Sequence, residues 1–122
     1  MTTPEISLAA INIRAADTAA LADFWAGVTG ATPSVNGDSA YLPPAGPHGF
    51  GIFFAPLEGP RPETQVVHVD LNVPSGTRAA EVERIIGLGA VHRWDNLTEF
   101  AHIRWTTLAD PEGNLFCVCE TP

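Results

Sequence analysis

Hydrophobic and polar residues alternate at the start of the chain and then change to a helical spacing. Residues 6–14 alternate between apolar and polar side chains, which predicts a strand with one buried face. Asp17 is a typical helix N-cap, and apolar residues recur at helical spacing from there to Gly30, a helix C-terminal residue. Asn36-Gly37 then favours a hairpin turn. The first half therefore reads as βαβββ, with strands expected over residues 6–14, 32–35, 39–42 and 50–55.

The same order of elements follows a proline-rich segment. Residues 56–65 contain three prolines, which predicts a linker because proline interrupts both sheets and helices. Beyond the linker, Ser75 is expected to cap a helix that ends at Leu88-Gly89. The sequence Asp110-Pro-Glu-Gly-Asn114 predicts a hairpin turn closed by a left-handed Gly113. The second half is again βαβββ, with strands expected over residues 66–73, 90–95, 101–108 and 115–120.

Superposing the two halves aligns their predicted elements and pairs individual positions. Ala10 falls on His68 and, at the same offset, Asn12 falls on Asp70. Few residues are identical, and what repeats is the order of elements, which indicates a duplicated subdomain; an unrelated α+β domain with chance spacing is the alternative. We therefore predict an α+β fold in which two βαβββ units form a concave mixed β-sheet cup. The expected organisation is one domain over residues 1–122, with repeats at 6–56 and 66–120 joined by linker 56–65.

Composition narrows the range of partners. At 122 residues the chain can form one core-bearing domain. Its 14 acidic and 6 basic residues give a net charge of -8 without a basic patch, which disfavours binding to nucleic acid or to an anionic membrane. No apolar run approaches the roughly 20 residues of a membrane-spanning helix. With two cysteines only two positions apart, reduced thiols and a cytoplasmic location are expected.

Four segments resemble the glyoxalase-like branch of the vicinal-oxygen-chelate superfamily, which also includes bleomycin-resistance proteins. They are residues 16–25 with Phe24-Trp25, residues 67–71, residues 87–90, and residues 108–117 with the Asp-Pro-Glu-Gly-Asn turn. The resemblance implies a cup that holds a small molecule. Members of the superfamily include metal-dependent lyases, isomerases, dioxygenases and fosfomycin-modifying enzymes, together with metal-free proteins that sequester antibiotics. Because related proteins often dimerise, the resemblance also implies a homodimer.

The resemblance places metal ligands at four strand positions. In this chain those positions are Ala10, Phe53, His68 and Cys117, and only the last two can bind a metal. Two ligands are fewer than the three protein ligands of a typical catalytic zinc site. We therefore expect the protein to work without a cofactor, and a divalent metal is the disfavoured alternative.

The expected site is centred on His68, which shares a strand face with Asp70. Val67 and Val69 on the opposite face are expected to meet the helices, so His68 should point into the cup. There it can act as an acid or base or hydrogen-bond a ligand; the alternative is a relic of an ancestral metal site. The residues expected to contact the ligand are Asn12, Phe53, His68, Asp70, Trp105 and Cys117.

Three functions are consistent with this site. The first is metal-independent binding of a small organic molecule, such as an antibiotic or a metabolite, with an aromatic or cationic group. The second is a lyase or isomerase that uses His68 as acid, base or metal ligand. The third is a scaffold or subunit without chemistry. The sequence alone does not decide whether the protein is an enzyme, because one residue type cannot establish catalysis.

Overall fold

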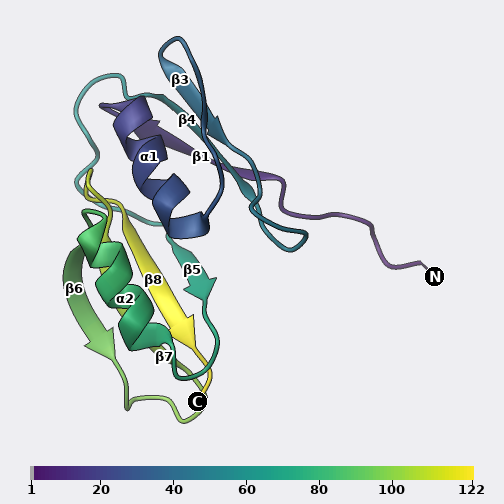
Figure 1. Cartoon of the computed structure of the whole chain (residues 1–122), viewed down its shortest axis with the longest axis vertical. Helices are drawn as coiled ribbons and strands as arrows, with labels where there is room; N and C mark the ends of the chain where they lie inside the picture. Colours follow the sequence, from purple (N-terminus) through teal and green to yellow (C-terminus); the bar gives the residue numbers. More distant parts are fainter. Residues whose placement is uncertain (1) are drawn as a thin grey trace. The chain divides into compact units, whose positions relative to one another are not determined.

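The chain forms two compact units, each with one helix and a four-stranded sheet. The computed structural model describes residues 2–122, and the units divide between Glu58 and Gly59. Both units have the order βαβββ, and Figure 1 shows a helix beside the sheet in each of them. The prediction of an α+β fold built from two βαβββ units is therefore confirmed.

Unit 1 is the N-terminal βαβββ unit. Its elements are β1 (Ala10–Ala15), α1 (Thr18–Thr29), β2 (Ser34–Asn36), β3 (Ser39–Leu42) and β4 (Gly51–Pro56). The sheet order is β1-β4-β3-β2, with β1 parallel to β4 and the other pairs antiparallel. A parallel pair needs a crossover, and β1 and β4 are connected through α1 and the β2–β3 hairpin.

Helix α1 begins and ends at the residues that the sequence predicted. The Asp17 carboxylate accepts a hydrogen bond of 3.0 Å from the Ala20 backbone N–H, which satisfies one free donor of the first turn. Gly30 ends the helix in the left-handed conformation with φ 84°. One face of the helix lies in the core of unit 1 through Leu21, Ala22, Phe24 and Trp25.

Unit 2 repeats this topology with the residues of the candidate site. Its elements are β5 (Val69–Asn72), α2 (Arg78–Gly87), β6 (Val91–Asn96), β7 (Arg104–Ala109) and β8 (Leu115–Glu120). The sheet order is β5-β8-β7-β6, with β5 parallel to β8. Within residues 2–122 neither helix is long and apolar enough to cross a membrane.

The turn between β7 and β8 is organised by one buried carboxylate. Asp110 Oδ1 accepts hydrogen bonds from the backbone N–H groups of Glu112 (3.0 Å) and Asn114 (2.9 Å). The Asn114 side-chain amide donates to both carboxylate oxygens, at 3.1 and 2.9 Å. Gly113 takes φ 89°, as the turn sequence predicted. Asp110 is only 2 % exposed. Its side chain takes the place of water as the hydrogen-bond acceptor for several polar groups of the turn.

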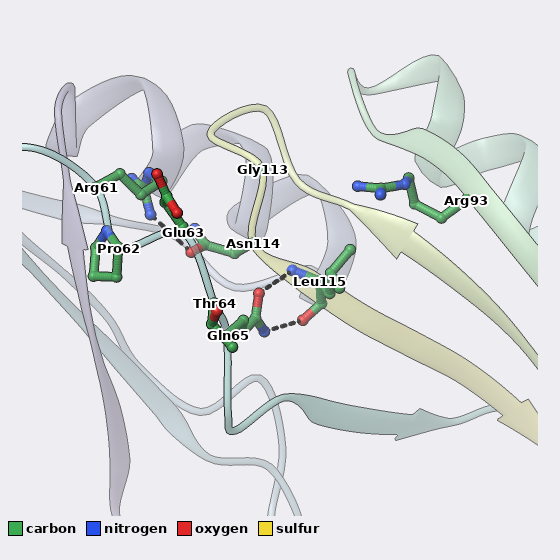
Figure 2. Close-up of a pocket in the computed structure, with 9 residues that line it drawn as sticks. All are labelled: Arg61, Pro62, Glu63, Thr64, Gln65, Arg93, Gly113, Asn114 and Leu115. Carbon is green, nitrogen blue, oxygen red and sulfur yellow. Dashed lines mark hydrogen bonds between the residues drawn. The ribbon is translucent and has the colours of Figure 1, made fainter.

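Both predicted first strands begin later than the alternating pattern indicated. Residues 6–9 and 66–68 lie outside the strands, and Val67 is 76 % exposed instead of facing a helix. The physical reason is clear in unit 2. The Gln65 side chain donates to the Leu115 carbonyl (2.9 Å) and accepts from the Leu115 N–H (2.7 Å), as Figure 2 shows. A side-chain amide therefore occupies the backbone groups that would extend the pairing of β5 with β8.

The N-cap of α2 also differs from the prediction. Thr77 stands at the cap instead of Ser75, and its side chain makes no capping hydrogen bond because it donates to the Pro74 carbonyl (2.6 Å). The Glu120 carboxylate accepts instead from the backbone N–H groups of Gly76 (2.9 Å) and Arg78 (3.2 Å). A charge from the last strand thus serves the helix N-terminus, where negative groups are stabilising.

Candidate functional site

Three side chains with metal-binding and proton-transfer chemistry come together on one face of unit 2. His68 lies one residue before β5, Asp70 lies in β5, and Cys117 is the residue of β8 that pairs with Asp70. His68 and Asp70 are two residues apart on an extended chain, so their side chains lie on the same side of the sheet. Cys117 is distant from His68 and Asp70 in sequence. The pairing of β5 with β8 brings it next to them.

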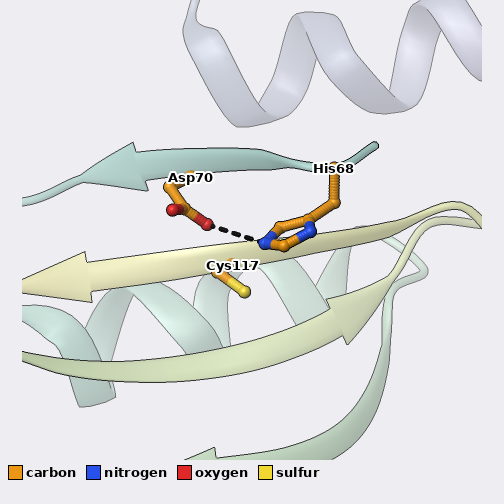
Figure 3. Close-up of side chains that lie close together, drawn as sticks. All are labelled: His68, Asp70 and Cys117. Carbon is orange, nitrogen blue, oxygen red and sulfur yellow. Dashed lines mark ion pairs between the residues drawn. The ribbon is translucent and has the colours of Figure 1, made fainter. Parts of the chain in front are cut away.

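The geometry of the group is compact and open to solvent. His68 Nε2 lies 3.2 Å from Asp70 Oδ1, with the two side chains 52 % and 61 % exposed. Cys117 is buried beneath them, and the donor atoms of all three residues lie within 4.8 Å of one another. Figure 3 shows the His68 ring directed along the strand toward Asp70, with the second ring nitrogen facing away from the carboxylate.

The Cys117 thiol is held in its protonated form. Burial raises the pKa of Cys117, and the nearby Asp70 carboxylate raises it further, while a contact of 3.3 Å with Thr107 Oγ1 acts in the opposite direction. Burial likewise raises the pKa of Cys119 to about 11. Because the thiolate is the reactive form of cysteine, neither residue is prepared as a nucleophile near neutral pH.

An aromatic side chain lies on the same face of the sheet, one row further along. Trp105 pairs with Cys119 and Thr107 pairs with Cys117. The Trp105 ring stacks on Phe100, with ring centroids 5.6 Å apart and planes inclined by 27°. It is half-buried and keeps part of its surface available for an apolar contact.

The remaining predicted ligand contacts lie in unit 1. Asn12 in β1 pairs with Phe53 in β4, the same positions in the topology that Asp70 and Cys117 occupy in unit 2. Both side chains are exposed, Phe53 by 37 %. The first-half positions that the family resemblance gives to metal ligands thus hold Phe53 and Ala10, neither of which binds a metal. The role of Asn12 and Phe53 as ligand contacts stays a prediction.

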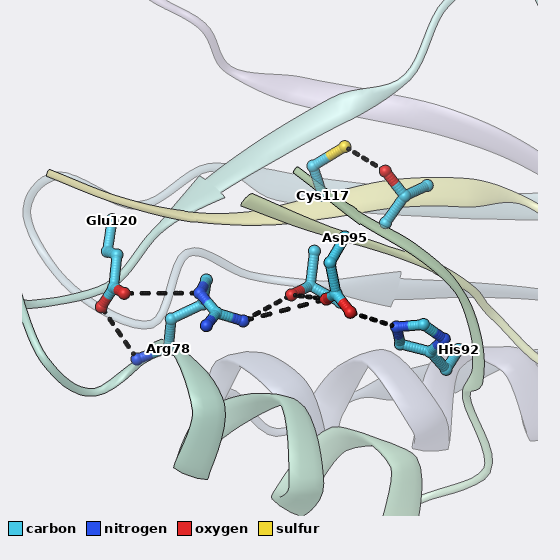
Figure 4. Close-up of polar contacts among 7 residues, drawn as sticks. Arg78, His92, Asp95, Cys117 and Glu120 are labelled. Carbon is cyan, nitrogen blue, oxygen red and sulfur yellow. Dashed lines mark hydrogen bonds and ion pairs between the residues drawn. The ribbon is translucent and has the colours of Figure 1, made fainter. Parts of the chain in front are cut away.

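The opposite face of the same sheet holds a polar network that the sequence did not predict. Arg78 Nη1 donates to Thr106 Oγ1 (2.6 Å), and that hydroxyl donates to Asp95 Oδ1 (2.6 Å). Arg78 Nε lies 3.3 Å from Glu120 Oε1, although the N–H is not aligned for a hydrogen bond. Figure 4 shows Arg78 between the two carboxylates, with His92 Nε2 reaching Asp95 at 3.0 Å.

The two carboxylates of this network are stabilised in their charged forms. The Thr106 hydrogen bond holds the pKa of Asp95 below its ordinary value against the effect of burial, and His92 and Arg78 act in the same direction. Burial alone would raise the pKa of Glu120, but the backbone N–H groups of Arg78 and Gly76 and the Arg78 guanidinium lower it overall. The network attaches α2 to the sheet that carries the His68 group on its other face.

No local sequence signal identifies this network. Arg78 lies at the start of a helix and Glu120 at the end of the chain, where each resembles an ordinary surface charge. Only the register of β7 with β8 and the position of α2 bring them together. The exposed Arg84 on the same helix, paired with Glu81 at 2.9 Å, has the same appearance in the sequence.

Most of the chain matches the sequence model of one protein family. Residues 10–119 match the sequence model of the family described as "Glyoxalase-like domain". A search of proteins with curated descriptions found no match.

Solved structures with the same fold have low sequence identity to this chain. A glyoxalase/bleomycin resistance protein/dioxygenase family enzyme from Burkholderia phytofirmans matches with a TM-score of 0.74 and 18% identity, covering 96% of this chain and 100% of its own. A glyoxalase/bleomycin resistance protein/dioxygenase from Nocardioides matches with a TM-score of 0.75 and 16% identity, over 98% and 86% of the chains. The fosfomycin resistance protein FosX from Mesorhizobium loti matches with a TM-score of 0.71 and 16% identity, over 99% and 95%. At these identities the likeness establishes the fold.

Proposed function

Because the chain belongs to the glyoxalase-like domain family, we propose that it binds a small organic molecule on the face of unit 2 that carries His68 and Asp70. The observation that supports this proposal is the exposed pair of His68 Nε2 and Asp70 Oδ1 at 3.2 Å. The family includes resistance proteins and enzymes that act on small molecules. In such a protein, an exposed polar pair offers defined hydrogen-bond donors and acceptors for recognising a ligand.

Asp70 lies beside one ring nitrogen of His68 and leaves the other nitrogen turned away from it. The neutral imidazole donates from one ring nitrogen and accepts at the other. In the tautomer that carries its proton on Nε2, the nitrogen 3.2 Å from Asp70 Oδ1, Nδ1 is the acceptor, and it faces away from the carboxylate (Figure 3). A ligand hydroxyl or ammonium group can donate to Nδ1. The same arrangement lets His68 accept a proton from a bound substrate, which is the role of a general base.

The surroundings of the pair indicate the character of the ligand. Trp105 lies two strands from β5 on the same face, which is about 10 Å across the strands. It shares a row with Asn72, which is four residues, or about 13 Å, along β5 from His68, so the ligand has to be elongated. A molecule with a hydrogen-bond donor at one end and an aromatic or apolar group at the other can contact both His68 and Trp105. The Asp70 carboxylate and the net charge of -8 favour a cationic or neutral ligand over an anion.

A ligand screen by thermal shift, followed by substitution of His68, tests the proposal. At about 100 times its dissociation constant, a ligand should stabilise the protein by about 2.7 kcal/mol. His68→Ala should weaken binding by about tenfold or more, since a good charge-assisted or imidazole hydrogen bond contributes at least about 1.4 kcal/mol. His102→Ala is the matched control, because His102 is an exposed histidine of the same unit outside the site. Equal affinity of His68→Ala and wild type for every hit would reject the proposal.

A divalent metal site is a second candidate, favoured by the convergence of three different donors. Zinc bonds to His, Asp and Cys have lengths of about 2.0–2.3 Å, so two ligand atoms on one tetrahedral ion lie about 3.3–3.8 Å apart. The donor atoms of His68, Asp70 and Cys117 lie within 4.8 Å of one another, so a side-chain movement of about 1 Å would let them hold a zinc ion with one coordination position left over. A bound zinc ion would supply Lewis-acid activation of a water or ligand oxygen. Cys117 would have to release its proton, which its raised pKa opposes.

Cysteine substitution separates this candidate from metal-independent binding. If zinc is bound, Cys117→Ser should lower the zinc affinity by about tenfold or more in calorimetric titration of chelator-treated protein. Cys119→Ser should leave it unchanged, because Cys119 lies outside the group. Binding should also tighten as pH rises toward the pKa of Cys117. Zinc titrations that are identical for both variants, or that show no saturable site in wild type, would exclude the metal site and leave ligand binding intact.

A further inference from the structure

A pocket separate from the His68 group lies within unit 2, on the end of the sheet where β7 turns into β8. It has a volume of about 370 Å³ and is lined by segment 61–65, by the turn residues 113–115 and by Arg93 on β6. Figure 2 shows segment 61–65 on one side of the turn and Arg93 on the other. This volume is within the range of pockets that bind small molecules.

The walls of this pocket are fixed by hydrogen bonds before any ligand binds. Gln65 holds segment 61–65 to β8 through its two bonds to the Leu115 backbone. Arg61 Nη2 pairs with the Glu112 carboxylate at 2.7 Å, and its Nη1 donates to Asn114 Oδ1 at 3.0 Å. Arg61 is therefore neutralised and belongs to the wall. A fixed wall lowers the entropy lost on binding.

Two other charged side chains of opposite sign line the pocket, and neither is paired in the way that Arg61 is. Within residues 2–122, neither Arg93 nor Glu63 has an ion pair or a hydrogen bond to another side chain. The hydroxyl of Thr64, which also lines the pocket, is likewise without a hydrogen bond in this part of the chain. Together these three side chains offer one cation, one anion and one group that both donates and accepts.

The backbone accounts for the position of Arg93. The register of β6 with β7 shifts between His92 and Trp94, so Arg93 is the extra residue of a β-bulge. Bulges redirect a side chain and are frequent beside functional sites. The Arg93 guanidinium carbon lies 5.7 Å from the centre of the Trp94 ring, a cation–π contact that restricts the side chain without neutralising it.

We propose that this pocket binds a small zwitterion, such as a free amino acid or a dipeptide. The ligand carboxylate pairs with Arg93, its ammonium group pairs with Glu63, and Thr64 hydrogen-bonds to either. A simple anion would be repelled by Glu63 and a simple cation by Arg93, whereas a zwitterion satisfies both. Because ion pairs between exposed groups are weak, the expected dissociation constant is no tighter than a few millimolar, on the order of 5–10 mM. This site is separate from the His68 site, so its test is independent of the function proposed above.

Nuclear magnetic resonance of the ¹⁵N-labelled full chain tests this proposal with L-leucine and with L-alanyl-L-leucine as probes. At about 10 mM, at least one probe should shift the amide signals of Thr64, Gly113, Asn114 and Leu115 in a saturable manner. The N-acetylated and the C-amidated forms of that probe should each bind several-fold more weakly, since each lacks one charge. The proposal is overturned if neither probe shifts these signals, or if the blocked forms bind as well as the free probe.

Two substitutions assign the two ends of the ligand. In Arg93→Gln the free probe and its C-amide should bind equally, while the preference for a free ammonium group remains. In Glu63→Gln the free probe and its N-acetyl form should bind equally. Arg104→Gln and Glu83→Gln are matched controls, since both residues are exposed charges of unit 2 outside the pocket. If Arg93→Gln and Glu63→Gln keep the wild-type preference for both free ends, the assignment is wrong.

Discussion

Replacing Asp110 with alanine is expected to destabilise the protein by about 2–4 kcal/mol. The Asp110 carboxylate accepts hydrogen bonds from two backbone N–H groups and from the Asn114 side-chain amide, and its removal leaves partly buried donors without acceptors. Each unsatisfied buried donor costs about 1–3 kcal/mol. Chemical denaturation followed by Trp fluorescence measures the change in the free energy of unfolding.

Asp38→Ala provides the matched comparison for this effect. Asp38 also stands in a hairpin turn, between β2 and β3, but its side chain is exposed. Its loss should change the free energy of unfolding by about 0.5 kcal/mol or less, as for most surface substitutions. Asp110→Asn should fall between the two, because it keeps one acceptor oxygen. If Asp110→Ala is as stable as Asp38→Ala, the turn does not depend on the carboxylate.

The second large effect is expected for Arg78→Met, which keeps the aliphatic length of the side chain and removes its charge. Glu120 would lose its guanidinium partner and Thr106 its donor, on the buried side of the sheet. Removing one partner of a buried charged network is strongly destabilising. The melting temperature should fall by roughly 5–10 °C. Differential scanning calorimetry at neutral pH measures this shift.

The pH dependence of that effect provides its control. Folding lowers the pKa values of Asp95 and Glu120 from their ordinary values of 3.8 and 4.5. The two carboxylates therefore contribute fully to stability above those ordinary pKa values. Their contribution is lost as the pH falls through the lowered pKa values of the folded protein. The difference in melting temperature between wild type and Arg78→Met should therefore shrink below about pH 4. Arg84→Met, on the exposed face of α2, should differ little from wild type at any pH. A gap that is constant with pH, or equal for both variants, would contradict this account.

Elements set by local residues were predicted from the sequence. Asp17 and Gly30 define the ends of α1, and Gly113 takes the left-handed conformation expected of the β7–β8 turn. Each of these features depends on a few residues that are adjacent in sequence, and the conformational preferences of those residues determine it. The order of the elements followed from the same signals, and with it the α+β fold.

Features that depend on residues distant in sequence were predicted only in part. The family resemblance indicated His68 and Cys117 as the two of four expected metal-ligand positions whose side chains can bind a metal, and strand register places Asp70 directly beside Cys117. The side-chain amide of Gln65 ends the β5–β8 pairing, which an alternating pattern cannot reveal. The Glu120 carboxylate takes the place of the expected Ser75 cap, and it too is distant in sequence from the residues that it contacts. Hydrophobic periodicity carries no information about such polar contacts.

Binding of a small molecule to unit 2 through His68 and Asp70 can be observed directly at the residues of the site. The most direct measurement is a ¹⁵N and ¹³C nuclear magnetic resonance titration of the wild-type chain with the strongest hit of the thermal-shift screen. Saturable shifts are expected of the His68 ring signals, of the Asp70 and Cys117 amides and of the Trp105 indole N–H. Shifts confined to signals outside this group, with the His68 ring unchanged at saturation, would contradict binding through His68 and Asp70.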